Sequence, residues 1–169
     1  MDDLVRTFQE LVAQVPEAVQ PIIVVLVAAI PFLEGEGASV IGVLGGIHPV
    51  VAGLAAAAGN FLSVLAVVLF GSRVRTAALA GRSRGAELPA EPESESKGRR
   101  RFRRWLVRFG VPGASILGPL AIPTQFTSAM LVAAGTPRGW LLLWQGVAIV
   151  LWTTLATVVA WGVVTAVAG

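Results

Sequence analysis

The chain has 169 residues, of which 55% are hydrophobic and 14% are charged, whereas a soluble domain is roughly half apolar and about a quarter charged. So little charge argues against an ordinary water-soluble protein and points to a membrane. The chain has no cysteine and one histidine, which excludes disulfides, thiolate metal sites and cysteine nucleophiles. It also has no nucleotide-binding or hydrolase motif, so we predict no enzyme activity, no cofactor and no metal site.

The formal net charge of +3 is unevenly distributed. All of the 13 basic residues except Arg6 and Arg138 lie between Arg73 and Arg108. Such a segment can bind nucleic acid or anionic lipid headgroups. The simplest interpretation is a loop that orients a membrane protein, because cytoplasmic loops are rich in lysine and arginine. We therefore expect residues 71–108 to form a basic cytoplasmic loop at the cell membrane, with no nucleic-acid partner.

The N-terminal segment, residues 1–20, carries Leu4, Phe8 and Leu11 at helical spacing among acids and amides. This pattern predicts an amphipathic helix that lies at the membrane interface. No basic stretch precedes the first apolar run, so a cleavable signal peptide is not expected.

Residues 21–70 are predicted to form the first of two repeats. Their first apolar stretch is interrupted by Pro31 and by Glu34-Gly35-Glu36-Gly37, and it is too short to cross about 30 Å of hydrocarbon as a helix. Broken backbone at membrane depth is tolerated where protein or a water-filled cavity satisfies its polar groups. We therefore expect a re-entrant hairpin over residues 22–47, followed by a transmembrane helix over residues 50–70.

Residues 109–164 are predicted to repeat this plan. A short apolar stretch rich in glycine and proline covers residues 109–135 and is broken at Pro123-Thr124-Gln125. It predicts a second re-entrant hairpin. Residues 140–164 then form a second transmembrane helix that begins with Trp140, a residue type common at membrane interfaces.

A cytoplasmic segment 71–108 makes the two hairpins open toward opposite sides of the membrane. The predicted fold class is therefore an all-α integral membrane protein. It has two re-entrant helical hairpins, each followed by a transmembrane helix, in an inverted-topology repeat, and an N-terminal amphipathic helix. In transporters built this way, the hairpin tips meet near the middle of the membrane and form the binding site.

Glu34 and Glu36 are the strongest indication of function, because a charged residue deep in a membrane helix costs about 2.5 to 3.5 kcal/mol. Burial and mutual repulsion both disfavour the charged form of such a pair, so at least one carboxyl group is expected to carry a proton part of the time. This behaviour is typical of proton coupling. Alternatively, both acids are solvated at an exposed hairpin mouth, or they pair with an arginine for structural reasons.

Polar groups at the second break and on the neighbouring elements are candidate substrate contacts. Hydroxyls and amides at a half-helix N-terminus can bind an anion, and arginines can bind a phosphate bidentately. Equally, the hydroxyls can bond back to their own helix, the asparagine can bond between helices, and the arginines can anchor the topology. The candidate substrate-binding residues are Asn60, Arg108, Pro123, Thr124, Gln125, Thr127 and Arg138. His48 and Trp161 are expected at the interface.

Three stretches carry a resemblance to a known family: Pro31-Phe32-Leu33-Glu34-Gly35-Glu36-Gly37, Gly59-Asn60, and the segment from Arg108 through Ala121-Ile122-Pro123-Thr124-Gln125 to Ala129. Together they resemble the small multidrug export family, a relative of the DedA (SNARE-associated, VTT) superfamily. Members often have an arginine where this chain has Glu36, and a second proline where it has Gln125. The resemblance implies two re-entrant hairpins and movement of lipids such as polyprenyl phosphate carriers.

The leading functional hypothesis from the sequence is a proton-coupled transporter of an amphiphilic, phosphate-bearing lipid, with protons and membrane lipids as its partners. In this hypothesis Glu34 and Glu36 titrate, and Arg108 and Arg138 contact the headgroup. Export of small hydrophobic cations is the first alternative, since intramembrane acids suit a cation directly. A structural membrane protein that transports nothing is the second. A homo-oligomer is compatible with each.

Overall fold

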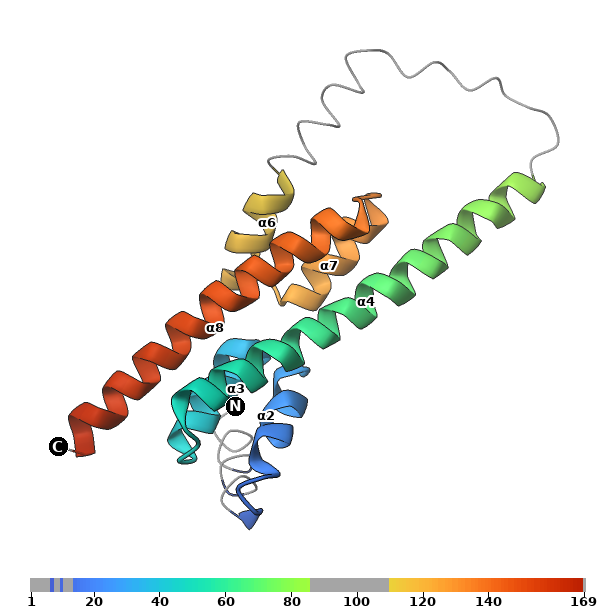
Figure 1. Ribbon diagram of the computed structural model, residues 1–169. Coiled ribbons are helices and arrows are strands. Elements are labelled where there is room, and N and C mark those ends of the chain that lie inside the picture. Colours follow the sequence, from blue (N-terminus) through green and yellow to red (C-terminus); the bar gives the residue numbers. More distant parts are fainter. Residues whose placement is uncertain (1–6, 8–9, 11–13, 86–109, 169) are drawn as a thin grey trace.

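The computed structural model describes residues 7, 10, 14–85 and 110–168. Within these ranges the regular secondary structure is helical and no strand occurs. Figure 1 shows two long helices with two groups of short helices beside them. The helices are α2 (Gln20–Ala28), α3 (Glu34–Leu44), α4 (Pro49–Gly85), α6 (Val111–Leu117), the 3-10 turn η2 (Gly118–Leu120), α7 (Thr124–Ala133) and α8 (Arg138–Ala168).

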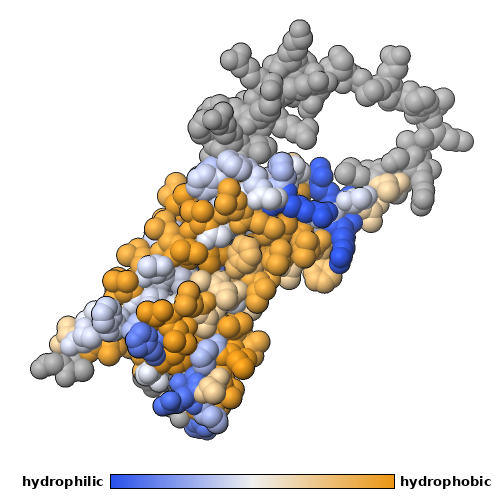
Figure 2. Space-filling view, viewed as in Figure 1, coloured by the Kyte–Doolittle hydropathy of each residue, from blue (hydrophilic) through white to orange (hydrophobic). Residues whose placement is uncertain are grey.

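The long helices α4 and α8 run antiparallel and pack against each other (Figure 1). Their apolar parts, Pro49–Ala78 and Arg138–Ala166, contain 30 and 29 residues. At 1.5 Å per residue each is about 44 Å long, which exceeds the hydrocarbon thickness of about 30 Å. Only 33% and 28% of their most apolar windows are buried inside the protein, and Figure 2 shows a mainly apolar surface over both. Both helices are therefore long and apolar enough to cross a membrane.

The short helices α2 and α3 pack on each other and on α4, and α3 also packs on α8. They contain 9 and 11 residues, which makes each about 14 to 17 Å long. Small side chains permit the close approach: a Cβ added to Gly59 would collide with the backbone carbonyl of Val25, and one added to Gly42 would lie 2.9 Å from the Cβ of Ala52. The buried core of this half includes Val24, Val27, Ala38, Ile41, Ala52 and Ala56.

In the second half, α6 packs mainly on α8, and α7 packs mainly on α4. A buried cluster of Val64, Val68, Val132, Leu141 and Ile149 joins α4, α7 and α8. The backbone break between the short helices falls at residues 121–123, where Pro123 has an extended conformation (φ −52°, ψ 144°) and α7 starts at the next residue. The predicted break at Pro123-Thr124-Gln125 is therefore close, but Thr124 and Gln125 already belong to the helix.

The first break also differs from the prediction. It lies at residues 29–33, and Glu34-Gly35-Glu36-Gly37 forms the first turn of α3 instead of a connecting turn. The physical reason is the helix dipole, which favours acidic side chains at a helix N-terminus. The turn is made by Phe32 and Glu34, which have positive φ angles of 73° and 48°.

Helix α4 continues beyond the predicted end of the first transmembrane helix at Phe70 and reaches Gly85. Residues 71–85, expected as the start of the basic loop, are helical because arginine, alanine and leucine are strong helix formers. Residues 86–108 and most of the predicted amphipathic helix at 1–20 lie outside the described residues, although Thr7, Glu10 and Gln14 are helical.

Candidate functional site

The two breaks in the short helices meet between the long helices. Glu34 begins α3 and Thr124 begins α7, and their polar atoms are in direct contact although 90 residues separate them in the chain. The backbone N–H of Thr124 donates to Glu34 Oε1 at 2.5 Å, and the Thr124 hydroxyl donates to the same oxygen at 2.6 Å. The carboxylate of one half of the protein therefore caps a helix of the other half.

This contact answers a requirement of α7. The first N–H groups of a helix have no partner within it, and the residue before α7, Pro123, provides no side-chain cap. A carboxylate at this position pairs a free N–H and interacts favourably with the positive end of the helix dipole. Binding of an anionic substrate at the N-terminus of α7 was one of the two interpretations of the sequence; in the structure the carboxylate of Glu34 already occupies the first position there.

The backbone around Glu34 is unusual. Its φ angle of 48° and that of Phe32, 73°, lie in the left-handed region, which costs a non-glycine residue about 1 to 2 kcal/mol. Glu34 is also buried, with 5% of its surface exposed. Strained residues persist where the surrounding structure holds them in place, and they cluster at functional sites.

Asn60 on α4 extends the network. It is fully buried, and its Oδ1 atom lies 3.0 Å from the Thr124 hydroxyl oxygen. This hydroxyl has a single proton, which goes to the closer Glu34 carboxylate at 2.6 Å. The oxygen and nitrogen of a side-chain amide have nearly the same size and shape, so the hydrogen bonds around the amide decide which of them lies on which side. Rotating the Asn60 amide lets its nitrogen, otherwise without a partner, donate to the Thr124 oxygen.

A second polar chain runs beside the first. Gln125 Nε2 donates to the Ser63 hydroxyl at 3.3 Å, and this hydroxyl donates to the backbone carbonyl of Ala29 at 3.3 Å. Ser63 lies one helical turn after Asn60 on α4, so both polar groups occupy the same face of this helix. The end of α2, the middle of α4 and the start of α7 are thereby connected through side chains.

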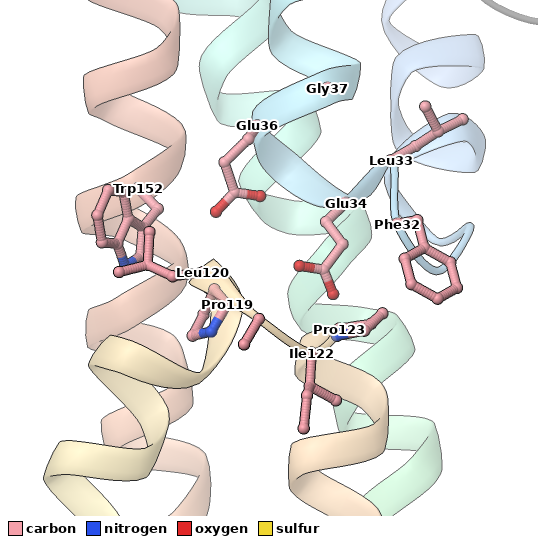
Figure 3. A pocket seen from close by; sticks show the side chains of 11 residues that line it. Phe32, Leu33, Glu34, Glu36, Gly37, Pro119, Leu120, Ile122, Pro123 and Trp152 are labelled. Atoms are coloured by element: carbon pink, nitrogen blue, oxygen red, sulfur yellow. The ribbon is translucent and has the colours of Figure 1, made fainter. Parts of the chain in front are cut away.

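A cavity of about 320 Å³ lies between the two breaks (Figure 3). Figure 3 shows the side chains of Glu34 and Glu36 pointing from α3 toward the second break, with Trp152 of α8 on the Glu36 side. The indole N–H of Trp152 donates to the carbonyl of Ile116 at 2.8 Å, which fixes the ring at the cavity wall. The remaining lining is mostly apolar, from residues 32–33, Gly37 and residues 119–123. Among the described residues, the charged groups of the lining are the two carboxylates.

Glu34, Glu36 and Pro123 lie in the cavity wall, and Asn60, Thr124 and Gln125 belong to the network around it. Thr127 is 8% exposed and packs beside Gly118, inside the second group of short helices and away from the cavity lining.

The predicted arginine contacts are not part of the described site. Arg138 begins α8 and does not line the cavity, and Arg108 lies outside the described residues. Sequence reasoning missed Trp152 and Ser63. Both residues could have been found from the sequence. Trp152 lies in the middle of an apolar span and not at its end, where an interfacial tryptophan is expected. Ser63 follows Asn60 at helical spacing, which places a second polar group on the same face of the helix.

In its described residues the protein is all-helical, with two helices long and apolar enough to cross a membrane and, between the two breaks of the short helices, a cavity that contains two carboxylates. No protein-family model, curated protein or solved structure matches the chain.

Proposed function

We propose that the protein is a membrane transporter in which protons and the substrate use the carboxylates of the cavity in turn. The observation that carries this proposal is the position of Glu34, whose carboxylate from the first half of the chain caps α7 in the second half. A titratable group that joins two halves across a cavity can link its protonation to their relative arrangement.

The proposed setting is the cell membrane. In it, α4 and α8 span the bilayer, and the helix pairs α2/α3 and α6/α7 are re-entrant hairpins whose breaks meet at the cavity. Their short lengths and the antiparallel course of α4 and α8 support this inverted repeat. The basic segment that begins on α4 faces the cytoplasm. This is the architecture implied by the resemblance to the DedA-like and small multidrug export proteins.

The mechanism follows from the charge of Glu34. As a carboxylate it accepts two hydrogen bonds from Thr124 and stabilises the N-terminus of α7. A proton on Glu34 removes the negative charge and weakens this contact, which loosens the connection between the halves. Glu36 faces the same cavity, so a proton or a cationic substrate can neutralise the pair. When the proton is exchanged for the cationic substrate, the carboxylate pair stays neutralised and no unpaired charge is left buried.

The charges in the cavity favour a hydrophobic cation as the substrate. Two carboxylates and the ring of Trp152 contribute to its wall, and both groups attract cations. A phosphate-bearing lipid, the leading hypothesis from the sequence, requires basic contacts, and Arg138 does not line the cavity. We therefore propose proton-coupled export of amphiphilic cations as the function.

Proteoliposomes with an imposed pH gradient test this proposal. Tetraphenylphosphonium serves as the cation, and a fluorescent polyprenyl phosphate serves as the anionic lipid. We expect movement of the cation that is driven by the gradient and lost in Glu36→Gln, whereas Glu17→Gln, at an exposed residue that does not line the cavity, retains it. Movement of the lipid instead of the cation would contradict the substrate class. Movement of neither would contradict transport.

A further inference from the structure

Two fully buried polar side chains lie one helical turn beyond the network around Glu34, and neither has a hydrogen-bond partner in the described structure. Both amide atoms of Gln145 on α8 are unpaired, and so is the hydroxyl of Ser128 on α7. Ser128 is four residues after Thr124 and therefore lies on the same face of α7. The interior next to the contact between Glu34 and Thr124 thus offers unused donors and acceptors.

The positions of these groups follow from the apolar cluster of Val64, Val68, Val132, Leu141 and Ile149, which joins α4, α7 and α8. Ser128 lies one turn before Val132 on α7. Gln145 lies between Leu141 and Ile149 on α8, one turn from each. Side chains four residues apart share a helix face, so Ser128 and Gln145 project into the core between the three helices. Toward the start of α8, the layer of Val132 and Leu141 closes this core.

An unpaired polar group in a core is costly and rare in native proteins. An apolar side chain at position 145 would make the described arrangement more stable. Residues that break such a rule are expected mainly where function requires them. The amide of Gln145 is therefore explained by a partner that it acquires at another stage of the transport cycle.

We propose that Ser128 and Gln145 bind water that carries the proton of Glu34 to the side of the membrane where α8 begins. The inference rests on the proposed proton-coupled transport and assigns the exit route of the proton. A proton that reaches Glu34 through the cavity weakens the cap of α7, as described above. Loosening of α7 then opens the layer of Val132 and Leu141 to water. Apolar constrictions of this kind gate by losing and regaining water.

The chemistry of the exit step requires only proton transfer between oxygen atoms. The carboxyl group of Glu34 gives its proton to a neighbouring water and becomes a carboxylate again, which restores the cap on Thr124. The proton then passes from water to water toward the start of α8, about 10 Å along the helix from Gln145. Gln145 orients these waters with two donors and an acceptor and is not ionised. The sequence has no charged residue at 49–72, 124–133 or 139–168, so within these stretches no side-chain charge competes with water for the proton.

Two assays on proteoliposomes that contain the full chain separate the proton route from the path of the substrate. The first measures net movement of tetraphenylphosphonium driven by an imposed pH gradient. The second measures exchange of labelled for unlabelled tetraphenylphosphonium at equal pH, which requires no net movement of protons. Gln145→Leu should lower the first rate about tenfold, a smaller effect than the roughly hundredfold loss expected on removing a proton-transferring group itself. It should leave the second rate unchanged, because Gln145 does not line the cavity.

Three further variants complete the test. Ser128→Ala should also lower the gradient-driven rate alone, and Gln145→Asn, which keeps an amide, should retain most of it. Thr157→Val removes a buried hydroxyl of α8 that already donates to the carbonyl of Thr153 at 2.6 Å, and it should keep both rates. Denaturant unfolding checks that Gln145→Leu is at least as stable as the parent, which excludes misfolding as the cause.

Two results would overturn the proposed exit route. One is a full gradient-driven rate in both Gln145→Leu and Ser128→Ala. The other is an equal loss of both rates in Gln145→Leu, because it would place Gln145 in the path of the substrate. A parent protein that is inactive in both assays would contradict the proposed function itself, and the exit route with it.

Discussion

Glu34 Oε1 accepts two hydrogen bonds from Thr124, at 2.5 Å from the backbone nitrogen and 2.6 Å from the hydroxyl oxygen. The two residues begin helices in different halves of the chain. A buried acid that would otherwise be destabilising is thereby made into the cap of α7. This contact accounts for a carboxylate at 5% exposure in a mainly apolar protein.

The energy of this contact can be measured with a double-mutant cycle. Glu34→Gln and Thr124→Ala should each lower the free energy of unfolding by about 1.5 to 3 kcal/mol, because the first replaces the charged acceptor by a neutral one and the second removes a hydrogen bond to it. The double variant should lose less than the sum. Unfolding in detergent by denaturant titration gives these values, and Glu17→Gln is the control. Additive effects would show that Glu34 and Thr124 do not interact.

Gly59 tests the close approach of α2 and α4. A Cβ at this position would collide with the main chain of Val25, which cannot rotate away as a side chain could. Gly59→Ala is therefore expected to lower the thermal stability of the protein, at a cost of about 1 to 3 kcal/mol for overpacking. In Gly162→Ala the added methyl group meets no atom within 4 Å, so that variant should keep the stability of the parent. Equal midpoints would argue against this packing.

Gln145 and Gln125 are both buried, but their amides differ. Neither amide atom of Gln145 has a partner in the described structure, whereas Gln125 donates to Ser63. Replacing an unpaired buried amide by an apolar side chain of similar size removes a desolvation cost. Gln145→Leu should thus raise the free energy of unfolding by about 1 kcal/mol, and Gln125→Leu should lower it by a similar amount. Chemical denaturation measures both, and a loss of stability in Gln145→Leu would contradict the expectation.

The proposed inverted repeat predicts that the starts of α4 and α8 face opposite sides of the membrane. His48 and Trp161 line the same groove, and α8 extends from Trp161 back to Arg138 over about 35 Å. The chain has no native cysteine, so His48→Cys and Arg138→Cys can be labelled with an impermeant maleimide in sealed vesicles. We expect labelling from opposite sides. Labelling of both from the same side would refute the arrangement.

Much of this protein follows from local properties of the sequence. Hydropathy and the rise of a helix identified the two long helices, and proline and glycine indicated the two short groups, because both depend on residues close together in the chain. Glu34, Glu36 and Asn60 could also be singled out as candidate site residues from the sequence, since polar groups are costly among apolar neighbours. The exact breaks were not, because the helix dipole drew the acidic segment into the first turn of α3.

Only the tertiary structure decided which groups meet. The contact between Glu34 and Thr124 spans 90 residues, and no local pattern specifies the partner of a residue so far away. Packing of the short helices on α4 and α8 closed the N-terminus of α7 with a carboxylate, placed Trp152 beside Glu36 and left Arg138 out of the cavity lining. That packing sets the sign of the charge in the cavity, because electrostatic attraction depends on the distance between groups in space and not on their positions in the sequence. The proposed cationic substrate follows from that sign.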